Sequence, residues 1–331
     1  MQKLFGALAL VASFIANDVF AKEVVVYSSR KEHLVKPLFD RYEEKTAVKI
    51  RYITGDPGPL MSRIEVEAEK TPADILFTVD AGNLWQAANK DLLQPIKSPT
   101  LTKAVPAHLR DANNRWFGLS VRARTIIYNT KNVKPEDLST YEALAAPEWK
   151  GRLCLRTSKK VYNKSLVAMM IARHGVEDAE KVVNGWVKNL AAAPYSNDTK
   201  AIEAVAAGVC DATIVNTYYF GRLLKKSADL PLAVYWPNQE KSGVHVNISG
   251  AGITKNAKNP EEAQALLEWL SSDEAQKLFA SLNMEYPVTA DVQPDAKVAA
   301  WGTFKQDPIN VAKAGELQAQ AVKLMDRAGY R

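Results

Sequence analysis

The sequence predicts an α/β protein with two lobes and a cleft between them. Strand-like and helix-like segments alternate in two separate sets, at 22–92 and 151–216, and a long β-rich segment at 115–130 connects them. The chain has 331 residues, which is enough for two lobes with cores of their own. Lobes that are joined by a few crossing segments can close over a ligand by hinge motion.

The export signal is the first 21 residues, which have the pattern of a signal peptide. The short apolar run Leu4–Ile15 is followed by Val19 and Ala21, which fit the −3 and −1 positions of a cleavage site. The run is shorter than the about 20 apolar residues that span a membrane, and an N-terminal anchor that stays in place is the alternative. We therefore expect an exported, soluble protein that begins near Lys22. Export and the two-lobed architecture together indicate a solute-binding protein.

The first lobe is expected to begin with residues 22–121. Its strand-like runs are rich in β-branched residues, and its helix-like segments repeat apolar residues every three or four positions, as Leu34, Leu38 and Tyr42 do. This order implies a parallel sheet with helices on its faces. The expected strands are 22–29, 47–55 and 71–80, and the expected helices are 30–46, 60–70 and 81–92.

The second lobe, residues 122–245, is expected to repeat the alternation. Residues 246–331 should return to the first lobe and add C-terminal helices. Asn259 as an N-cap and Pro260 at the first helical position indicate the start of one long helix at 259–280. The other expected elements are strands at 151–156, 210–216, 232–237 and 245–255 and helices at 164–174, 176–189, 198–208 and 308–328.

The charge of the chain does not indicate a nucleic-acid partner. There are 43 Lys and Arg residues against 37 Asp and Glu residues, which gives a formal net charge of +6. A basic stripe would indicate nucleic acid, but here the basic residues lie beside acidic ones along the helical segments. We therefore expect mixed, solvated helix faces and no nucleic-acid binding.

The two cysteines, Cys154 and Cys210, occupy matching positions in two strand-like runs. Each precedes a tyrosine by eight residues, Tyr162 in the first case and Tyr218 in the second. Neighbouring parallel strands would bring the cysteines together as a disulfide, which an oxidising compartment permits, and would hold the two tyrosines near each other. The alternative is a pair of buried free thiols. A C-x-x-C redox motif is excluded by the spacing.

Two adjacent tyrosines, Tyr218 and Tyr219, directly follow the apolar run Cys210–Asn216, which indicates a buried strand. Ligands of open α/β sheets lie beyond the carboxyl ends of the strands. Adjacent strand residues point to opposite faces, so both phenols reach one spot only if the strand breaks after Asn216. Gly221 would then help to permit the turn that follows. The alternative is that one tyrosine packs in the core and the other faces water.

Seven segments carry a family resemblance that covers essentially the whole mature chain. They are VVVYSSRKEH (24–33), PADILFTVDAGNL (72–84), GLSVRARTIIYN (118–129), LCLRTSKKVYNKSLVA (153–168), IVNTYYFGRL (214–223), NISGAGITKNAKNPEEAQALLEWLSSDEAQ (247–276) and EYPV (285–288). With these segments the chain resembles the periplasmic ferric-ion-binding proteins, the iron-capturing components of bacterial ABC transporters. The resemblance implies the two-lobed type II periplasmic-binding fold with hinge strands, a periplasmic location, and permease and ATPase partners. A monomer is expected.

The resemblance also implies a set of binding residues. In this family, the tyrosine after the TSKK segment and the adjacent tyrosine pair bind ferric iron, which corresponds here to Tyr162, Tyr218 and Tyr219. Relatives often hold a carbonate-like anion against arginines of the cleft, and the matching positions are Arg30 and Arg122. We therefore expect Fe3+ together with carbonate or bicarbonate in the cleft.

Both arginine assignments have alternatives. Arg30 would otherwise form an ion pair, at the surface or between the lobes. Arg124, two residues beyond Arg122 and on the same strand face, competes with it for the anion. Tyr27 is expected to line the cleft or to pack in the core, and not to bind the metal.

The chain departs from some relatives directly after the YSSR segment. Those relatives have His-Tyr there and use both residues as further ligands, whereas this chain has Lys31 and Glu32, followed by His33. A lysine is a poor neighbour for a cation and a good one for an anion. We therefore expect an anion, and no side chain of the first lobe, to complete the iron shell. Glu32 and His33 are expected to open a helix, where Glu32 suits the positive N-terminal end, and the alternative is that one of them enters the cleft as an iron ligand.

Phenols suit ferric iron for electrostatic reasons. Fe3+ is small and highly charged and prefers anionic oxygen, whereas softer metals prefer sulfur. Free tyrosine is neutral at neutral pH, so an empty site has no repelling carboxylates, and a bound cation favours the phenolate. Metal binding therefore releases protons, and acid is expected to weaken it.

Two other functions compete with iron binding. Another small solute, such as a polyamine, a phosphonate or a different organic anion, could use the same fold. Such a solute gives no reason to gather three tyrosines. A secreted enzyme is the third candidate, but the chain has no nucleophile elbow, no HExxH motif and no convincing Ser/His/Asp arrangement. We therefore do not expect an enzyme.

Overall fold

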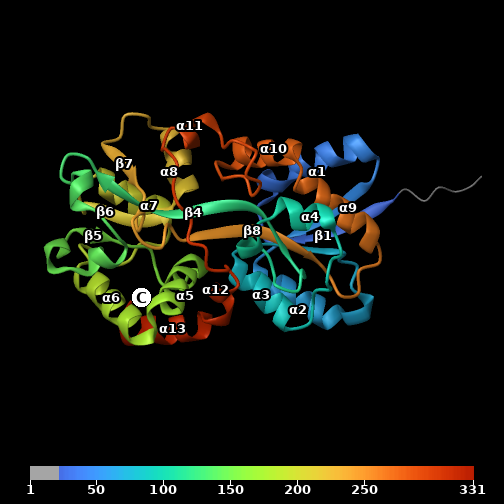
Figure 1. The fold of residues 1–331 in the computed structure, drawn as a ribbon, viewed down its shortest axis with the longest axis horizontal. Coiled ribbons are helices and arrows are strands. Elements are labelled where there is room, and N and C mark those ends of the chain that lie inside the picture. The colour runs from blue at the N-terminus through green and yellow to red at the C-terminus, as the bar shows by residue number, and fades with distance from the viewer. Residues whose placement is uncertain (1–21) are drawn as a thin grey trace, which may run out of the picture.

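The computed structural model describes residues 22–331, so the expected signal peptide lies outside the described residues. Within this range, eight strands form a continuous sheet in the order β2-β1-β3-β8-β4-β6-β5, and β7 pairs with β4. The strands are β1 (Glu23–Ser28), β2 (Lys49–Thr54), β3 (Ile75–Val79), β4 (Phe117–Asn129), β5 (Leu153–Cys154), β6 (Ala212–Asn216), β7 (Leu232–Tyr235) and β8 (Val246–Ile253). Figure 1 shows that the helices gather around the two ends of this sheet as two lobes.

The longest strand, β4, joins the two lobes. Its first half, from Phe117 to Ala123, pairs with β8, and its second half, from Arg124 onward, pairs with β6 and β7. All 13 of its residues are buried, as expected for a strand that leaves one core and enters another. β8 crosses between the lobes beside it (Figure 1). The prediction that the segment at 115–130 connects the lobes is confirmed.

The first lobe packs its helices around β1, β2 and β3, which pair in parallel as predicted. The predicted single helix at 259–280 is wrong, because the chain forms two helices there. The Ser272 side chain accepts a hydrogen bond from the Ala275 backbone N–H and caps a new helix, which the apolar periodicity alone does not reveal. The helices are α1 (Glu32–Thr46), α2 (Pro57–Glu67), α3 (Ala81–Asn89), α4 (Pro99–Ala104), α9 (Pro260–Leu270) and α10 (Asp273–Asn283).

The second lobe contains most of the remaining helices. The predicted helix at 308–328 is shorter and interrupted: α12 lies between α3 and α5, and α13 packs on α5 and α6. The close contact of α12 with the first lobe requires Gly315, because a Cβ atom there would lie 2.6 Å from the Trp85 Cβ atom. The helices are α5 (Val161–His174), α6 (Val176–Lys188), α7 (Asp198–Ala206), α8 (Thr217–Leu224), α11 (Ala296–Ala299), α12 (Lys313–Glu316) and α13 (Gln318–Arg327).

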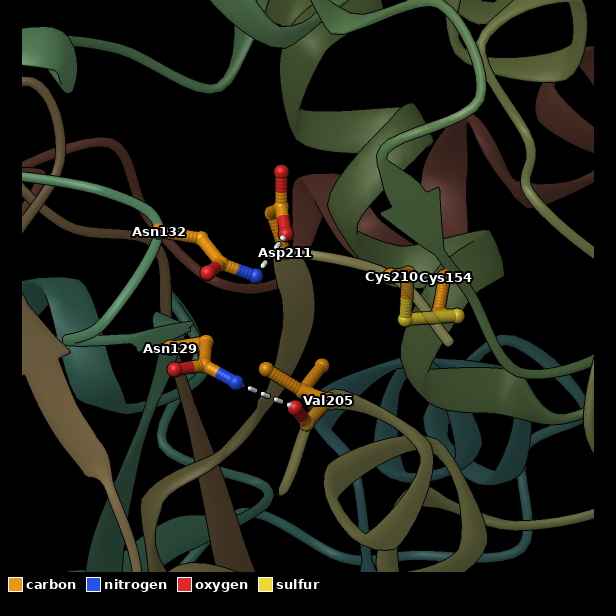
Figure 2. Close-up of a disulfide and its surroundings, with 6 residues drawn as sticks. All are labelled: Asn129, Asn132, Cys154, Val205, Cys210 and Asp211. Carbon is orange, nitrogen blue, oxygen red and sulfur yellow. Dashed lines mark hydrogen bonds between the residues drawn. A yellow bond between two sulfur atoms is a disulfide. The ribbon is translucent and has the colours of Figure 1, made fainter. Parts of the chain in front are cut away.

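A disulfide between Cys154 and Cys210 joins β5 to the start of β6, as predicted (Figure 2). The two strands are parallel neighbours, and the disulfide is buried against Val205 of α7. Close to it, the Asn129 side chain donates a hydrogen bond to the Val205 carbonyl oxygen (Figure 2). Because β5 and β6 run in the same direction, the segments that follow them, which lead to α5 and α8, leave the same edge of the sheet.

No helix within residues 22–331 combines the length and the apolar character that a membrane crossing requires.

Candidate functional site

A pocket of about 520 Å3 is lined by residues of both lobes. The first lobe contributes the segments after β1 and β2, at 29–31 and 54–57, and the second lobe contributes the starts of α5 and α8. These segments follow the carboxyl ends of parallel strands, where open α/β sheets bind ligands. The position of the pocket therefore follows from the strand order.

Tyr218 and Tyr219 lie in the first turn of α8, which begins directly after β6. The predicted break in the strand after Asn216 is therefore present. Both phenols line the pocket, and their ring centroids lie 4.3 Å apart. The helical turn makes this possible, because successive residues of a helix are rotated by about 100° instead of the 180° of a strand.

The prediction that Gly221 permits a turn is wrong, because Gly221 lies inside α8. It is a position of close packing instead. A Cβ atom at residue 221 would lie 3.0 Å from the Met284 Cε atom and 3.1 Å from the Trp301 Cη2 atom. The missing side chain lets α8 lie against the segments that carry Met284 and Trp301.

Tyr162 enters the same pocket from the first turn of α5. The Arg122 guanidinium lies near both helices, with its Cζ atom 6.0 Å from the Tyr162 ring centroid and 5.5 Å from that of Tyr218. The structure thus brings the three predicted tyrosines, Tyr162, Tyr218 and Tyr219, to one pocket. All three belong to helices of the second lobe.

The phenols of Tyr162 and Tyr218 are protonated at neutral pH. Burial raises the pKa of the Tyr162 phenol, against the opposing effect of the Arg122 guanidinium. Burial also raises the pKa of the Tyr218 phenol well above 10, and the neighbouring Tyr162 and Tyr219 act in the same direction. The metal-free pocket therefore holds neutral phenols that only a strongly bound cation would convert into phenolates.

Arg30 and Arg122 share the carboxylate of Glu285 at the base of the pocket. The Arg30 Nη1 and Nη2 atoms each lie 3.1 Å from a Glu285 carboxylate oxygen, and the Arg122 Nη2 atom lies 3.6 Å away. Both arginines also donate hydrogen bonds to the Ser249 hydroxyl. Burial alone would raise the pKa of Glu285, but the two guanidinium groups outweigh it and lower that pKa to about 2. Glu285 is therefore ionised and is a part of the site that the sequence did not indicate.

Comparison with known proteins assigns the chain to a family. A family model described as "Bacterial extracellular solute-binding protein" matches residues 37–306. The chain belongs to the bacterial extracellular solute-binding proteins. Iron uptake protein A1 of Synechocystis sp. is 43% identical over 316 residues, which are 94% of this chain and 88% of that relative.

Solved structures agree with this assignment. The Trichodesmium protein IdiA (FutA), solved in complex with iron and citrate ligands, is 46% identical, with a TM-score of 0.90 over 93% of this chain and 100% of the other. Ferric iron-binding protein A of Mannheimia haemolytica, in an open conformation, is 39% identical, with a TM-score of 0.88 over 94% of this chain and 99% of the other. The resemblance to the ferric-ion-binding proteins and the two-lobed α/β fold are confirmed.

Three other residues that the sequence singled out do not line the pocket of this solute-binding protein. The Tyr27 hydroxyl donates to the Glu67 carboxylate, and burial, followed by Glu67, raises the pKa of Tyr27 to about 12. Glu32 begins α1 and accepts a hydrogen bond from the Tyr52 hydroxyl. His33 is exposed on α1. Of Lys31, Glu32 and His33, Lys31 alone lines the pocket.

Several cationic side chains that the sequence did not single out also line the pocket of this solute-binding protein. Arg156 and Lys160 precede α5, and Arg222 lies on α8 with its Cζ atom 4.8 Å from the Tyr218 ring centroid. Arg124, the alternative to Arg122, does not line the pocket and donates a hydrogen bond to Asp198. The charged lining residues are the cations Arg30, Lys31, Arg122, Arg156, Lys160 and Arg222 and the carboxylates Asp56 and Glu285.

Proposed function

We propose that this solute-binding protein captures ferric iron with the phenolate oxygens of Tyr162, Tyr218 and Tyr219. The observation that carries this proposal is the meeting of three phenols from two separate helices in one pocket. Within residues 22–331, no group of three or more His, Cys, Asp or Glu side chains is arranged to hold a metal ion. The three phenols are therefore the largest set of like oxygen donors in the pocket, beside the carboxylates of Asp56 and Glu285, and hard Fe3+ is the metal that they suit best.

The charge of the pocket supports an additional anion in the site. The three negative charges of the phenolates cancel the charge of one ferric ion. The remaining charge of the loaded site comes from the six cationic side chains and the two carboxylates of the pocket, and it is positive. A carbonate, or another carboxylate, would occupy the remaining iron positions and offset this excess. Arg122, together with Arg30, is proposed to hold this anion, with Lys31 on the first-lobe side. The iron-and-citrate complex of the Trichodesmium relative supports an iron site that includes a carboxylate.

The proposed role in the cell is iron uptake. Relatives over nearly the whole chain are named iron uptake and ferric iron-binding proteins. We propose that the mature protein works in the periplasm as a monomer and delivers iron to a membrane permease that is driven by an ATPase. The family description as an extracellular solute-binding protein supports such partners.

Visible absorbance of the purified, metal-free protein tests the proposal. Addition of ferric citrate, with and without bicarbonate, should produce a broad orange-to-red phenolate-to-iron band. Tyr219→Phe should keep the fold, because the variant loses only a hydroxyl group. It should nevertheless abolish or strongly weaken this band, because that hydroxyl supplies one of the ligand oxygens. Tyr235→Phe is the matched control, since Tyr235 lies in the same lobe and its hydroxyl donates to the Leu138 carbonyl oxygen, 2.8 Å away. If the wild type shows no band under either condition, the iron assignment is wrong, and organic anions become the solutes to screen.

A further inference from the structure

A buried polar cluster lies behind the tyrosine pocket. The fully buried Asp198 carboxylate, at the start of α7, accepts hydrogen bonds from both Arg124 and Arg156. Arg156 also lines the pocket, with its Cζ atom 5.6 Å from the Tyr162 ring centroid. Asp198 therefore holds the Arg156 guanidinium next to Tyr162.

Asn163 connects this cluster to the first turn of α5. It follows Tyr162 directly, and its Oδ1 atom accepts a hydrogen bond from Arg124. Its Nδ2 atom donates to the carbonyl oxygens of Arg156, at 3.0 Å, and Thr157, at 3.1 Å. Asn163 thus fixes both the backbone that carries Arg156 and the helical turn that carries Tyr162.

The C-terminal end of the chain completes the cluster. Tyr330, the second-last residue, is buried, and its hydroxyl donates to the Arg156 carbonyl oxygen at 2.7 Å. The same hydroxyl accepts a hydrogen bond from the Asn163 Nδ2 atom at 2.7 Å. The Arg331 carbonyl oxygen accepts a bond from the Ser158 backbone N–H at 3.2 Å. The last two residues therefore hold the loop that leads into α5.

We propose that Tyr330 is a positioning residue for the metal-binding tyrosines. Its hydroxyl hydrogen-bonds to the Arg156 carbonyl oxygen and to the Asn163 side chain and so holds both residues at the start of α5. This inference rests on the proposed iron-binding function. Tyr330 does not line the pocket, so any effect on the metal must pass through the residues that it holds. Groups that orient metal ligands from outside typically change metal affinity by roughly 10- to 100-fold when they are removed.

Tyr330→Phe is the informative variant, since it removes one hydroxyl and keeps the ring in place. The Asn163 Nδ2 atom retains its two carbonyl acceptors, so we expect the fold to persist. Tyr235→Phe is again the matched control. It removes a hydroxyl that donates to a backbone carbonyl in the same lobe, and Tyr235 does not line the pocket.

The test compares iron affinity, measured by competition with citrate, the wavelength of the phenolate-to-iron band and the melting temperature without iron. We expect Tyr330→Phe to bind iron about 10-fold more weakly with a shifted band, and Tyr235→Phe to match the wild type in both. Equal affinity and an unchanged band in Tyr330→Phe would overturn the positioning role but leave the proposed function intact. The positioning role would also be overturned if both variants lost iron affinity in proportion to their loss of melting temperature, because the effect would then come from general destabilisation. A wild type without a band would remove the proposed function and this inference with it.

Discussion

Glu285→Gln keeps the shape of a buried side chain and removes the charge that pairs with Arg30 and Arg122. The pKa of Glu285 is about 2 in the fold, against the ordinary value of 4.5. This difference corresponds to about 3 kcal/mol of stability at neutral pH. Breaking a buried ion pair from one side typically costs roughly 3–5 kcal/mol, which agrees in size. For a chain of this length, we expect a melting temperature about 5 °C lower.

Urea unfolding of the metal-free protein measures the effect, because urea, unlike guanidinium, does not screen charges. A lowered carboxyl pKa contributes stability above the ordinary value of 4.5, and this stability is lost as the pH falls through about 2. The gap between wild type and variant should therefore be constant near neutrality and shrink below 4.5. Asp178→Asn is the control, since its pair with Lys181 is exposed. No gap at neutral pH, or a gap that persists unchanged in acid, would refute the reasoning.

Three further predictions follow from the structure. Replacing both Cys154 and Cys210 by serine should lower the free energy of unfolding by about 4 kcal/mol, because the disulfide closes a loop across a separation of 56 residues; an unchanged urea midpoint would contradict this. Burial, followed by Arg124, lowers the pKa of His245 from 6.5 to about 3, so the unfolded state binds an extra proton below 6.5 and stability should fall as the pH drops. The expected loss is about 2 kcal/mol from pH 6.5 to about pH 5, and His245→Gln should remove it; the same pH slope in the variant would argue against this origin. Iron loading should release about three phenol protons per metal, which a titration in weakly buffered solution measures, and release of none would exclude phenolate binding.

The parts of the fold that local sequence determines could be predicted from the sequence. Apolar periodicity located the alternating elements and the crossing strand β4, because each pattern lies within a few residues. The equal spacing from Cys154 to Tyr162 and from Cys210 to Tyr218 indicated parallel neighbouring strands, which the disulfide and the strand pairing confirm.

Other features depend on contacts that leave no local pattern. In the sequence, Gly221 indicates a turn within the aromatic segment at 217–224. In the structure this segment is a helix, and Gly221 lets the helix pack closely against Met284 and Trp301. Glu285 lies 255 positions from Arg30 along the chain. Such a pairing is specified only when the whole sheet has formed, so neither residue reveals the other in the sequence.

The placement of all three tyrosines on the second lobe has a consequence for how the cargo leaves. Hinge motion that opened the cleft would take Lys31 and the segment after β2 away from the pocket, whereas the three tyrosines would move together on the second lobe. Under the proposed function, opening of the cleft therefore exposes the iron while its three phenolate ligands stay in place. Unloading at the membrane then requires a chemical step, such as protonation of the phenolates or a competing ligand, and the movement of the lobes controls access to that step.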